Sequence, residues 1–220
     1  MSIASVFGAE LPKLPGGSSG IPREAVLASQ RQRLVHGVTM AVAEKALAAT
    51  TISDITERAG VSKKTFYEHF PDKLHCFLAA YAHGAEALLA EVTAASVARR
   101  GEDAVEQYRA GTHAYLSFLQ REVPYARTFC LEMLAAGPEA AARHRACRTA
   151  FAESVGVWHA GHLPRHSDWR PVSAFELEAA TGLVYEIASA RIAAGETDHL
   201  LDARDDLVRC SLAVLGIRVA

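Results

Sequence analysis

A cluster of cationic and hydroxyl-bearing side chains follows a glycine in the N-terminal third of the sequence. In the stretch TTISDITERAGVSKKTFYEHFPDK, residues 50–73, it comprises Lys63, Lys64, Thr65, Tyr67 and His69. Lysine contacts phosphates or guanine edges, threonine offers a hydroxyl and a methyl group, and tyrosine and histidine donate to phosphates or stack. The chemistry that these residues offer is therefore contact with the backbone and base edges of a nucleic acid.

The alternative interpretation of this cluster is a solvated charged face, which is the usual setting of two adjacent lysines. Phe66 and Phe70 lie four residues apart and satisfy the apolar side of a helix by themselves. Tyr67 is then left exposed beside Lys63 and Lys64, which is an unusual composition for a surface that meets only solvent. The composition favours a groove-facing helix without excluding the solvated face.

Two short helices are predicted to position the cluster. Thr51 with Asp54 resembles a capping box for a helix over residues 52–59, and Gly60 ends that helix because it readily adopts positive φ. Ser62 then caps a second helix, residues 63–70.

Pro71 closes the second helix and, with Asp72, opens a long third one. A preceding helix that begins near Pro22 braces the pair. This order predicts a helix-turn-helix arrangement.

The remaining chain is helical by pattern, without strand-like alternation or a repeat. Breaks at Gly101, Pro124, Gly137 and Gly195, and one from Gly161 through Pro171, separate the segments. The predicted helices are 72–98, 103–120, 124–135, 138–160, 173–194 and 198–215. The sequence predicts an all-α protein of about nine helices: a flexible tail at 1–20, a helix-turn-helix domain at 21–71, and a second helical domain at 72–220.

The bulk composition limits the classes of function. The chain has 220 residues, 50% of them hydrophobic, and a formal net charge of −2. That charge does not suit a protein that coats nucleic acid or membranes without discrimination, so nucleic-acid contact requires a local patch. We find no signal peptide and no apolar run near the roughly 18 residues of a membrane span. Four widely spaced cysteines suggest reduced, mostly buried thiols, and we expect a cytoplasmic protein.

The stretch resembles the helix-turn-helix signature of the TetR family of bacterial transcriptional regulators. The family pattern T-x-x-x-I-x-x-x-A-G-V-S-x-x-T-x-Y-x-H-F-x-x-K is matched from Thr51 to Lys73, with many fixed positions at fixed spacing. The resemblance covers about residues 30–80. The rest agrees in helix number and length but carries no diagnostic motif.

This resemblance implies a set of DNA-contacting residues. Thr51 would meet a phosphate, the next helix would face the major groove, and Lys73 would clamp a further phosphate. The implied contact residues are Thr51, Ser62, Lys63, Lys64, Thr65, Tyr67, His69 and Lys73. The protein would be a regulator, a repressor by the commoner mode of the family, that binds a palindromic operator and requires no cofactor.

The resemblance also implies a homodimer whose last two helices form a four-helix interface. Two apolar stripes are compatible with it, although both could equally line the core of one chain. The first is Leu177, Ala180, Val184, Ile187 and Arg191; the second is Leu200, Leu207, Val208, Ser211 and Leu215.

In the family, a small molecule enters the helical domain and changes the separation of the two reading helices, which requires that it bind one spacing better than the other. Bulky side chains of the middle helices are the candidate ligand contacts, each also explicable as core. They are Tyr115, Phe118, Phe129, Met133, Trp158 and Tyr185. The alternative function is a helical small-molecule-binding protein that does not bind DNA.

Two other kinds of site, a metal centre and a catalytic centre, have weaker support. His159, His162 and His166 have spacings of three and four residues, but Pro164 interrupts the helix and no further ligand completes a tetrahedral site, so loop histidines rather than a metal site are expected. The chain contains no G-x-S-x-G, P-loop, H-E-x-x-H or dinucleotide motif. We therefore expect neither a metal site nor an enzyme.

Overall fold

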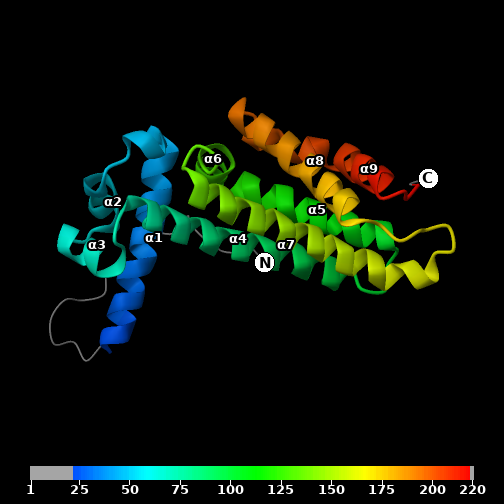
Figure 1. Cartoon of the computed structure of the whole chain (residues 1–220), viewed down its shortest axis with the longest axis horizontal. Coiled ribbons are helices and arrows are strands. Elements are labelled where there is room, and N and C mark those ends of the chain that lie inside the picture. Colours follow the sequence, from blue (N-terminus) through cyan, green and yellow to red (C-terminus); the bar gives the residue numbers. More distant parts are fainter. Residues whose placement is uncertain (1–21, 219–220) are drawn as a thin grey trace. The chain divides into compact units, whose positions relative to one another are not determined.

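The computed structural model describes residues 22–218, and most of these residues are helical. Within that range no β-strand occurs, only an isolated bridge between Arg100 and Glu102. The all-α prediction of nine α-helices is confirmed, and two 3-10 helices accompany them (Figure 1). The elements are α1 Arg23–Ala49, α2 Ile52–Ala59, α3 Lys63–His69, α4 Lys73–Ala98, α5 Ala104–Arg121, α6 Val123–Glu132, α7 Pro138–His162, η1 Leu163–Arg165, α8 Ala174–Ala193, η2 Thr197–Ala203 and α9 Arg204–Val214.

The chain divides into two compact units. The first contains the residues up to Gly84 together with Pro124–Ala140, and the second contains Ala85–Val123 together with the residues from Ala141 onward. The first unit therefore holds α1, α2, α3 and the beginning of α4, and α6 packs with them. The domain division predicted from the sequence stays a prediction, and the predicted tail at 1–20 lies outside the described residues.

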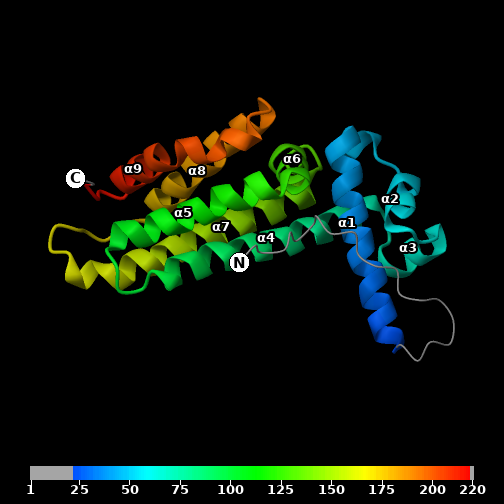
Figure 2. The ribbon, with the colours of Figure 1, turned by 180° about the vertical axis from the view of Figure 1, so that it is seen from behind.

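In the first unit, α1 packs closely against α2, as the views from both sides show (Figures 1 and 2). Leu34, Val38 and Ile55 are completely buried. Gly37 permits the approach, because a Cβ atom there would lie 2.8 Å from the carbonyl oxygen of Ile55. A larger residue would force the two backbones apart.

An aromatic cluster joins α6 to α4 within the first unit. The Phe129 ring centroid lies 5.1 Å from that of Phe77 and 4.7 Å from that of Tyr125. Tyr125 also lies directly on Gly84, where a Cβ atom would be only 1.9 Å from its ring. Glycine at this position therefore lets an aromatic side chain of α6 rest on the backbone of α4.

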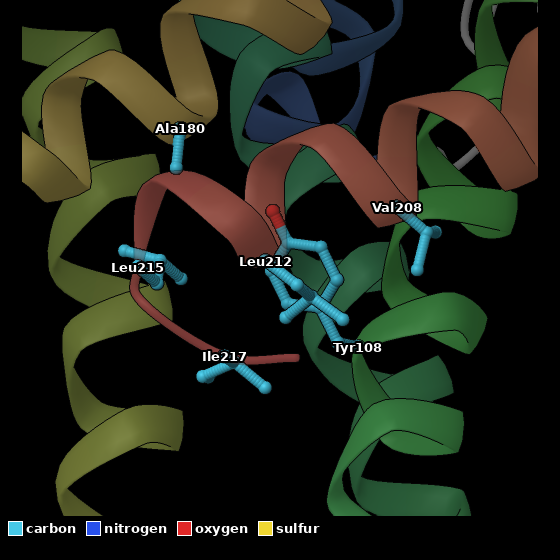
Figure 3. Packing of buried hydrophobic residues seen from close by; sticks show 6 residues of the cluster. All are labelled: Tyr108, Ala180, Val208, Leu212, Leu215 and Ile217. Atoms are coloured by element: carbon cyan, nitrogen blue, oxygen red, sulfur yellow. The ribbon is translucent and has the colours of Figure 1, made fainter. Parts of the chain in front are cut away.

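The core of the second unit brings α5, α8 and α9 together (Figure 3). Tyr108 of α5 is buried among apolar side chains, and burial raises the pKa of its hydroxyl to about 12 despite a hydrogen bond with Ser211. The Ser211 hydroxyl donates to the carbonyl oxygen of Ala180 at 3.2 Å. A hydrogen bond in the core thus links α8 to α9. The other members of this cluster are Val208, Leu212, Leu215 and Ile217.

The last predicted helix, residues 198–215, is divided. The structure has a 3-10 helix, Thr197–Ala203, before α9. With three residues per turn, side chains at positions i and i+3 align. Thr197, Leu200 and Ala203 have that spacing and all three are buried, so the tighter winding puts one face into the core.

Two findings concern the cysteines and the bilayer. Among residues 22–218 no disulfide joins the four cysteines, and only Cys76 is buried while the other three are half-buried, so the expectation of mostly buried thiols is wrong for those three. None of the helices in residues 22–218 combines the length and apolar character needed to cross a membrane.

Candidate nucleic-acid interface

The turn between α2 and α3 is formed by a glycine in the left-handed region. Gly60 has φ 60° and ψ 40°. Its N–H donates to the carbonyl oxygen of Glu57 at 3.1 Å, and the N–H of Val61 donates to that of Thr56 at 3.1 Å. This pair of bonds is the Schellman motif, which satisfies the last carbonyls of a helix. The predicted role of Gly60 is confirmed.

Side chains cap both short helices as the sequence indicates. The Thr51 hydroxyl accepts from the N–H of Asp54 at 3.2 Å, and the Asp54 carboxylate accepts from the N–H of Thr51 at 2.8 Å, which completes the capping box. The Ser62 hydroxyl accepts from the N–H of Thr65 at 3.0 Å. Each cap satisfies amides that a helix start leaves without a partner.

Two phenylalanines hold α3 against the rest of the unit. Phe66 is fully buried and Phe70 is 3% exposed, with 5.9 Å between their ring centroids. The guanidinium of Arg31, from α1, lies 4.5 Å from the centroid of the Phe70 ring. The predicted apolar face of α3 is confirmed, and it fixes which side of the helix meets solvent.

The opposite side of α3 is polar and accessible. Lys63 and Lys64 are exposed, and Tyr67 is 58% exposed. Both lysines stand in the first turn, where the peptide dipoles favour anions and disfavour cations. These cations therefore do not stabilise the helix on which they lie. A phosphate placed at this end would meet two ammonium groups and the amides of the helix start.

Thr65 and His69 lie on the flanks of α3 and are half-buried. His69 Nε2 is 3.2 Å from Oε1 of Gln30, on α1. Burial, followed by the charge of Arg31, lowers the pKa of His69 although Glu68 opposes this. His69 is thus a neutral side chain tied to α1, and no pattern in the sequence indicates this tie.

The two outer candidates, Thr51 and Lys73, already have protein partners. The Thr51 hydroxyl donates to the Asp54 carboxylate at 2.8 Å. The Lys73 ammonium donates to the carbonyl oxygens of Leu47 at 2.6 Å and Thr50 at 2.7 Å. Lys73 therefore caps the end of α1, a role that the sequence pattern did not predict. A third, longer bond at 3.5 Å goes to the carbonyl oxygen of Ala48, so all three donors of the ammonium group have protein acceptors. The predicted phosphate contact of Lys73 stays a prediction.

Arg33 is a further positioning residue without a signal in the sequence pattern. Its guanidinium, on α1, donates to the carbonyl oxygen of Ala59 at 2.8 Å and to that of Gly60 at 3.3 Å. These bonds fix the turn that leads into α3. The Lys63, Lys64 and Tyr67 side chains therefore project from a turn that α1 supports.

The predicted ligand contacts are divided between the two compact units. Phe129 and Met133 are buried in the first unit. Tyr115, Phe118, Trp158 and Tyr185 lie in the second unit, where Phe118 is fully buried. Tyr115 packs edge-on against Phe151 with 5.8 Å between ring centroids. The core interpretation therefore describes Phe118, Phe129 and Met133, and the ligand role of all six stays a prediction.

Most residues of the two predicted dimer stripes lie inside one chain. In the first stripe, Ala180 and Val184 are buried, whereas Ile187 is 40% exposed. In the second stripe every residue is buried, and Ser211 bonds back to Ala180. These stripes meet each other within the chain because α8 and α9 pack together. The alternative that they line the core of one chain is correct for all the buried members.

Of the three histidines expected in a loop, His159 and His162 instead lie on α7, which continues to His162, whereas His166 follows η1 outside any helix, as expected. His159 is buried and its ring stacks on Trp169, with 5.4 Å between centroids. Burial, followed by Arg170, lowers the pKa of His159. Nε2 of His159 and Nε1 of Trp158 are buried without a hydrogen-bond partner. Among residues 22–218 no group of histidine, cysteine and carboxylate side chains is arranged to hold a metal ion.

The chain is similar to known proteins in part of its sequence and in its fold. Residues 38–80 match the family model described as bacterial regulatory proteins, tetR family. The chain is 24% identical over 143 residues to the HTH-type transcriptional activator FasR of Mycolicibacterium smegmatis. The match covers 65% of this chain, and this chain spans 64% of the length of that relative.

Solved structures share the fold. The fatty acid degradation regulator FadR from Bacillus halodurans superimposes with a TM-score of 0.75 at 13% identity, over 86% of this chain and 97% of that one. FadR from Bacillus subtilis in complex with stearoyl-CoA gives a TM-score of 0.72 at 14% identity, over 84% of this chain and 98% of that one. A putative TetR-family regulator from Mesorhizobium loti gives a TM-score of 0.69 at 17% identity, over 88% of this chain and 98% of that one.

The family model thus matches the stretch that contains the motif around Gly60, and the solved structures share the fold of this chain. The resemblance drawn from that motif is thereby confirmed. The family model and these relatives are described as regulators.

Proposed function

We propose that the protein binds a palindromic DNA operator through the exposed side of α3. The observation that carries the proposal is the pair of exposed lysines, Lys63 and Lys64, at a helix start whose dipoles disfavour them, beside the exposed Tyr67. Surface residues that oppose the local helix electrostatics indicate selection for a partner. A DNA backbone supplies the missing anions.

Selection of bound sequences from random duplex DNA tests this proposal. We expect enrichment of a sequence with two inverted half-sites about one helical turn of DNA apart, roughly 10 base pairs. Enrichment of a single half-site would contradict the dimeric arrangement. No enrichment would favour the alternative function, a helical small-molecule-binding protein without DNA-binding activity.

The proposed homodimer uses the outer side of the last two helices. Phe175 on α8 is 78% exposed and Ile187 is 40% exposed, whereas the buried members of the predicted stripes are committed to the core. Exposed large apolar side chains on one helix are suited to a protein interface. The proposed interface thus keeps Ile187 of the first predicted stripe and adds Phe175, in place of the buried members.

Sedimentation of a Phe175→Ser variant tests the dimer face. We expect a shift toward monomer at micromolar concentration, because the variant removes the largest exposed apolar side chain of α8. Val157→Ser is the matched control, since Val157 is 75% exposed but lies on α7. Equal dimerisation of both variants would place the interface elsewhere.

We propose a fatty acyl-CoA as the effector, bound in the helical second unit. The support is that proteins of the same fold include a fatty acid degradation regulator, FadR from Bacillus halodurans, and the transcriptional regulator FadR from Bacillus subtilis in complex with stearoyl-CoA. The two unpartnered nitrogens of Trp158 and His159 are polar groups in an apolar surrounding, where a ligand oxygen would satisfy them.

Intrinsic fluorescence offers a direct test of effector binding. The chain has two tryptophans, and Trp158 and Trp169 lie 5.6 Å apart between ring centroids, so the signal reports on one place. We expect saturable quenching by stearoyl-CoA and not by coenzyme A alone. A linear response to both compounds would contradict the proposed effector class.

We propose that the protein represses transcription and acts in the cytoplasm, where the operator DNA lies. Repression requires that effector binding lower the affinity for the operator, since only a ligand with unequal affinity for the two states shifts their balance. A reporter gene behind the selected operator would become more active on addition of effector. A less active reporter would indicate an activator.

A further inference from the structure

The end of α1 contains a strained backbone turn at Ala46. This residue has φ 64° and ψ 161°, and it is the one non-glycine residue with positive φ in the part of the chain that the structure describes. That combination belongs to a region populated essentially by glycine, and other residues persist there only when their surroundings hold them. The contacts around Ala46 must therefore stabilise the turn.

Breaking the helix at Ala46 leaves the following amides without their usual carbonyl partners. The N–H of Leu47 instead donates to Oε2 of Glu132, on α6, at 2.9 Å. The carbonyl oxygen of Ala46 accepts from the N–H of Thr50 at 3.2 Å and from its hydroxyl at 2.8 Å. Residues 47–50 thus form one isolated helical turn whose first amide is capped by a residue from α6.

The two ends of this turn carry charges of opposite sign. Glu132 lies at its amino end, and the Lys73 ammonium binds the carbonyl oxygens of Leu47 and Thr50 at its carboxyl end. Anions at the start and cations at the end of a helical turn both match its peptide dipoles. The strained conformation is held by charged side chains from α6 and α4.

The turn leads directly to the start of α2. Thr51, the residue that follows it, caps α2, which continues through Gly60 into α3. The helix α2 packs on α1 at Gly37 and is hydrogen-bonded to it through Arg33. The chain must therefore reverse direction at Ala46 to bring α2 back onto α1. A second bond, from the Thr128 hydroxyl to the carbonyl oxygen of Thr39 at 3.0 Å, holds α6 beside α1.

We infer that Glu132 of α6 is a positioning residue of the DNA-binding surface, acting through the Ala46 turn that places α2 and α3. This role rests on the proposed function. A shift of α6 away from α1 would remove the cap from Leu47 and release the turn. Movement of α6 would thereby change the presentation of α3 without any contact between Glu132 and DNA.

Operator affinity of four variants tests this role, with the duplex obtained by selection. Glu132→Ala should weaken binding by at least ~10-fold, because it removes a charge-assisted hydrogen bond to a strained turn. Glu132→Gln retains an oxygen acceptor and should bind nearly as the wild type does. Ala46→Gly combined with Glu132→Ala should restore affinity to within about threefold, since glycine adopts the required φ without strain. Glu86→Ala, at an exposed carboxylate on α4, is the control.

Hydrogen exchange at the Leu47 amide provides a readout that does not depend on DNA. We expect faster exchange in Glu132→Ala and an unchanged rate in Glu132→Gln and Glu86→Ala. If the wild type enriches no duplex, the proposed function fails while this exchange comparison still tests the turn.

The inference is overturned if Glu132→Ala binds as tightly as Glu86→Ala, if glycine at position 46 restores nothing, or if Leu47 exchange is unchanged. If Glu132→Ala does not fold, Glu132→Asp shortens the side chain by one methylene and serves the same comparison.

Discussion

The surface of α3 and the interior around Trp158 place polar groups in opposite environments. On α3, Lys63, Lys64 and Tyr67 are accessible, and the apolar side of the helix is supplied by Phe66 and Phe70. Around Trp158, two ring nitrogens are buried without partners among stacked aromatic side chains. The polar groups of α3 are thus exposed to water, whereas the two ring nitrogens around Trp158 are shielded from it.

This difference separates two kinds of recognition. Exposed cations bind a polyanion with little rearrangement, so the proposed contact of α3 with DNA requires little change in this surface. Buried unsatisfied polar atoms destabilise a fold until something binds them, so the region around Trp158 gains from a ligand or water. We expect substitutions on α3 to change DNA affinity more than stability, and substitutions in the interior to do the reverse.

The largest expected effect comes from the residue that anchors α3. Phe66→Ala should lower the free energy of unfolding by about 3–5 kcal/mol, because a fully buried ring leaves a cavity. Tyr67→Ala, at the neighbouring exposed ring, should cost only a small fraction of this amount. Chemical denaturation of both variants measures the contrast. Comparable destabilisation in the two variants would mean that Tyr67 belongs to the core.

A substitution of Gly60, in the turn before α3, should have an intermediate effect on the stability of the protein. The sign should be opposite to that of a glycine substitution within a helix. Gly60→Ala should destabilise the protein by roughly 1–2 kcal/mol, because a Cβ atom is disfavoured at φ 60°. Gly161→Ala should stabilise it by up to about 1 kcal/mol, since Gly161 lies in α7 with nothing within 4 Å of its added Cβ. Thermal unfolding measures both changes. A stabilised Gly60→Ala variant would contradict the left-handed turn.

The interior should respond to pH through His159. Because burial lowers the pKa of His159 in the folded state below its ordinary value of 6.5, the unfolded chain binds a proton more readily. The contribution of His159 to the free energy of unfolding is therefore fully present above the pKa of this side chain in the unfolded state. It falls as the pH drops toward the pKa in the folded state, with a slope of at most ~1.4 kcal/mol per pH unit. Unfolding followed by tryptophan fluorescence should show a shallower acid dependence in His159→Gln. An unchanged slope would assign the effect to other histidines.

The DNA-binding elements were predictable because their signals are local. The Thr51 capping box, the Gly60 turn and the Ser62 cap each depend on residues a few positions apart, and all three occur in the structure. The exposed side of α3 follows once Phe66 and Phe70 take the buried side. The bonds of Arg33 and Lys73 were not predictable because their partners are backbone carbonyls distant in the sequence.

The helices of the second unit were predictable from the sequence, but which face of each helix is buried within the chain was not. An apolar stripe on α8 or α9 has the same spacing whether it meets another helix of the chain or a partner subunit. Only the packing of Ser211 against Ala180 assigns the second stripe to the core. The strained turn at Ala46 is likewise invisible in the sequence, because alanine there indicates an ordinary helix.

The central claim is that the cations of α3 contact DNA phosphates, and the salt dependence of operator binding tests it most directly. The smallest stability change, within about 0.5 kcal/mol, is expected for Lys63→Ala and Lys64→Ala. We predict that each nevertheless weakens operator binding and reduces the slope of log affinity against log salt by about one for each phosphate that the protein no longer neutralises. Wild-type affinity and slope in both variants would contradict the account.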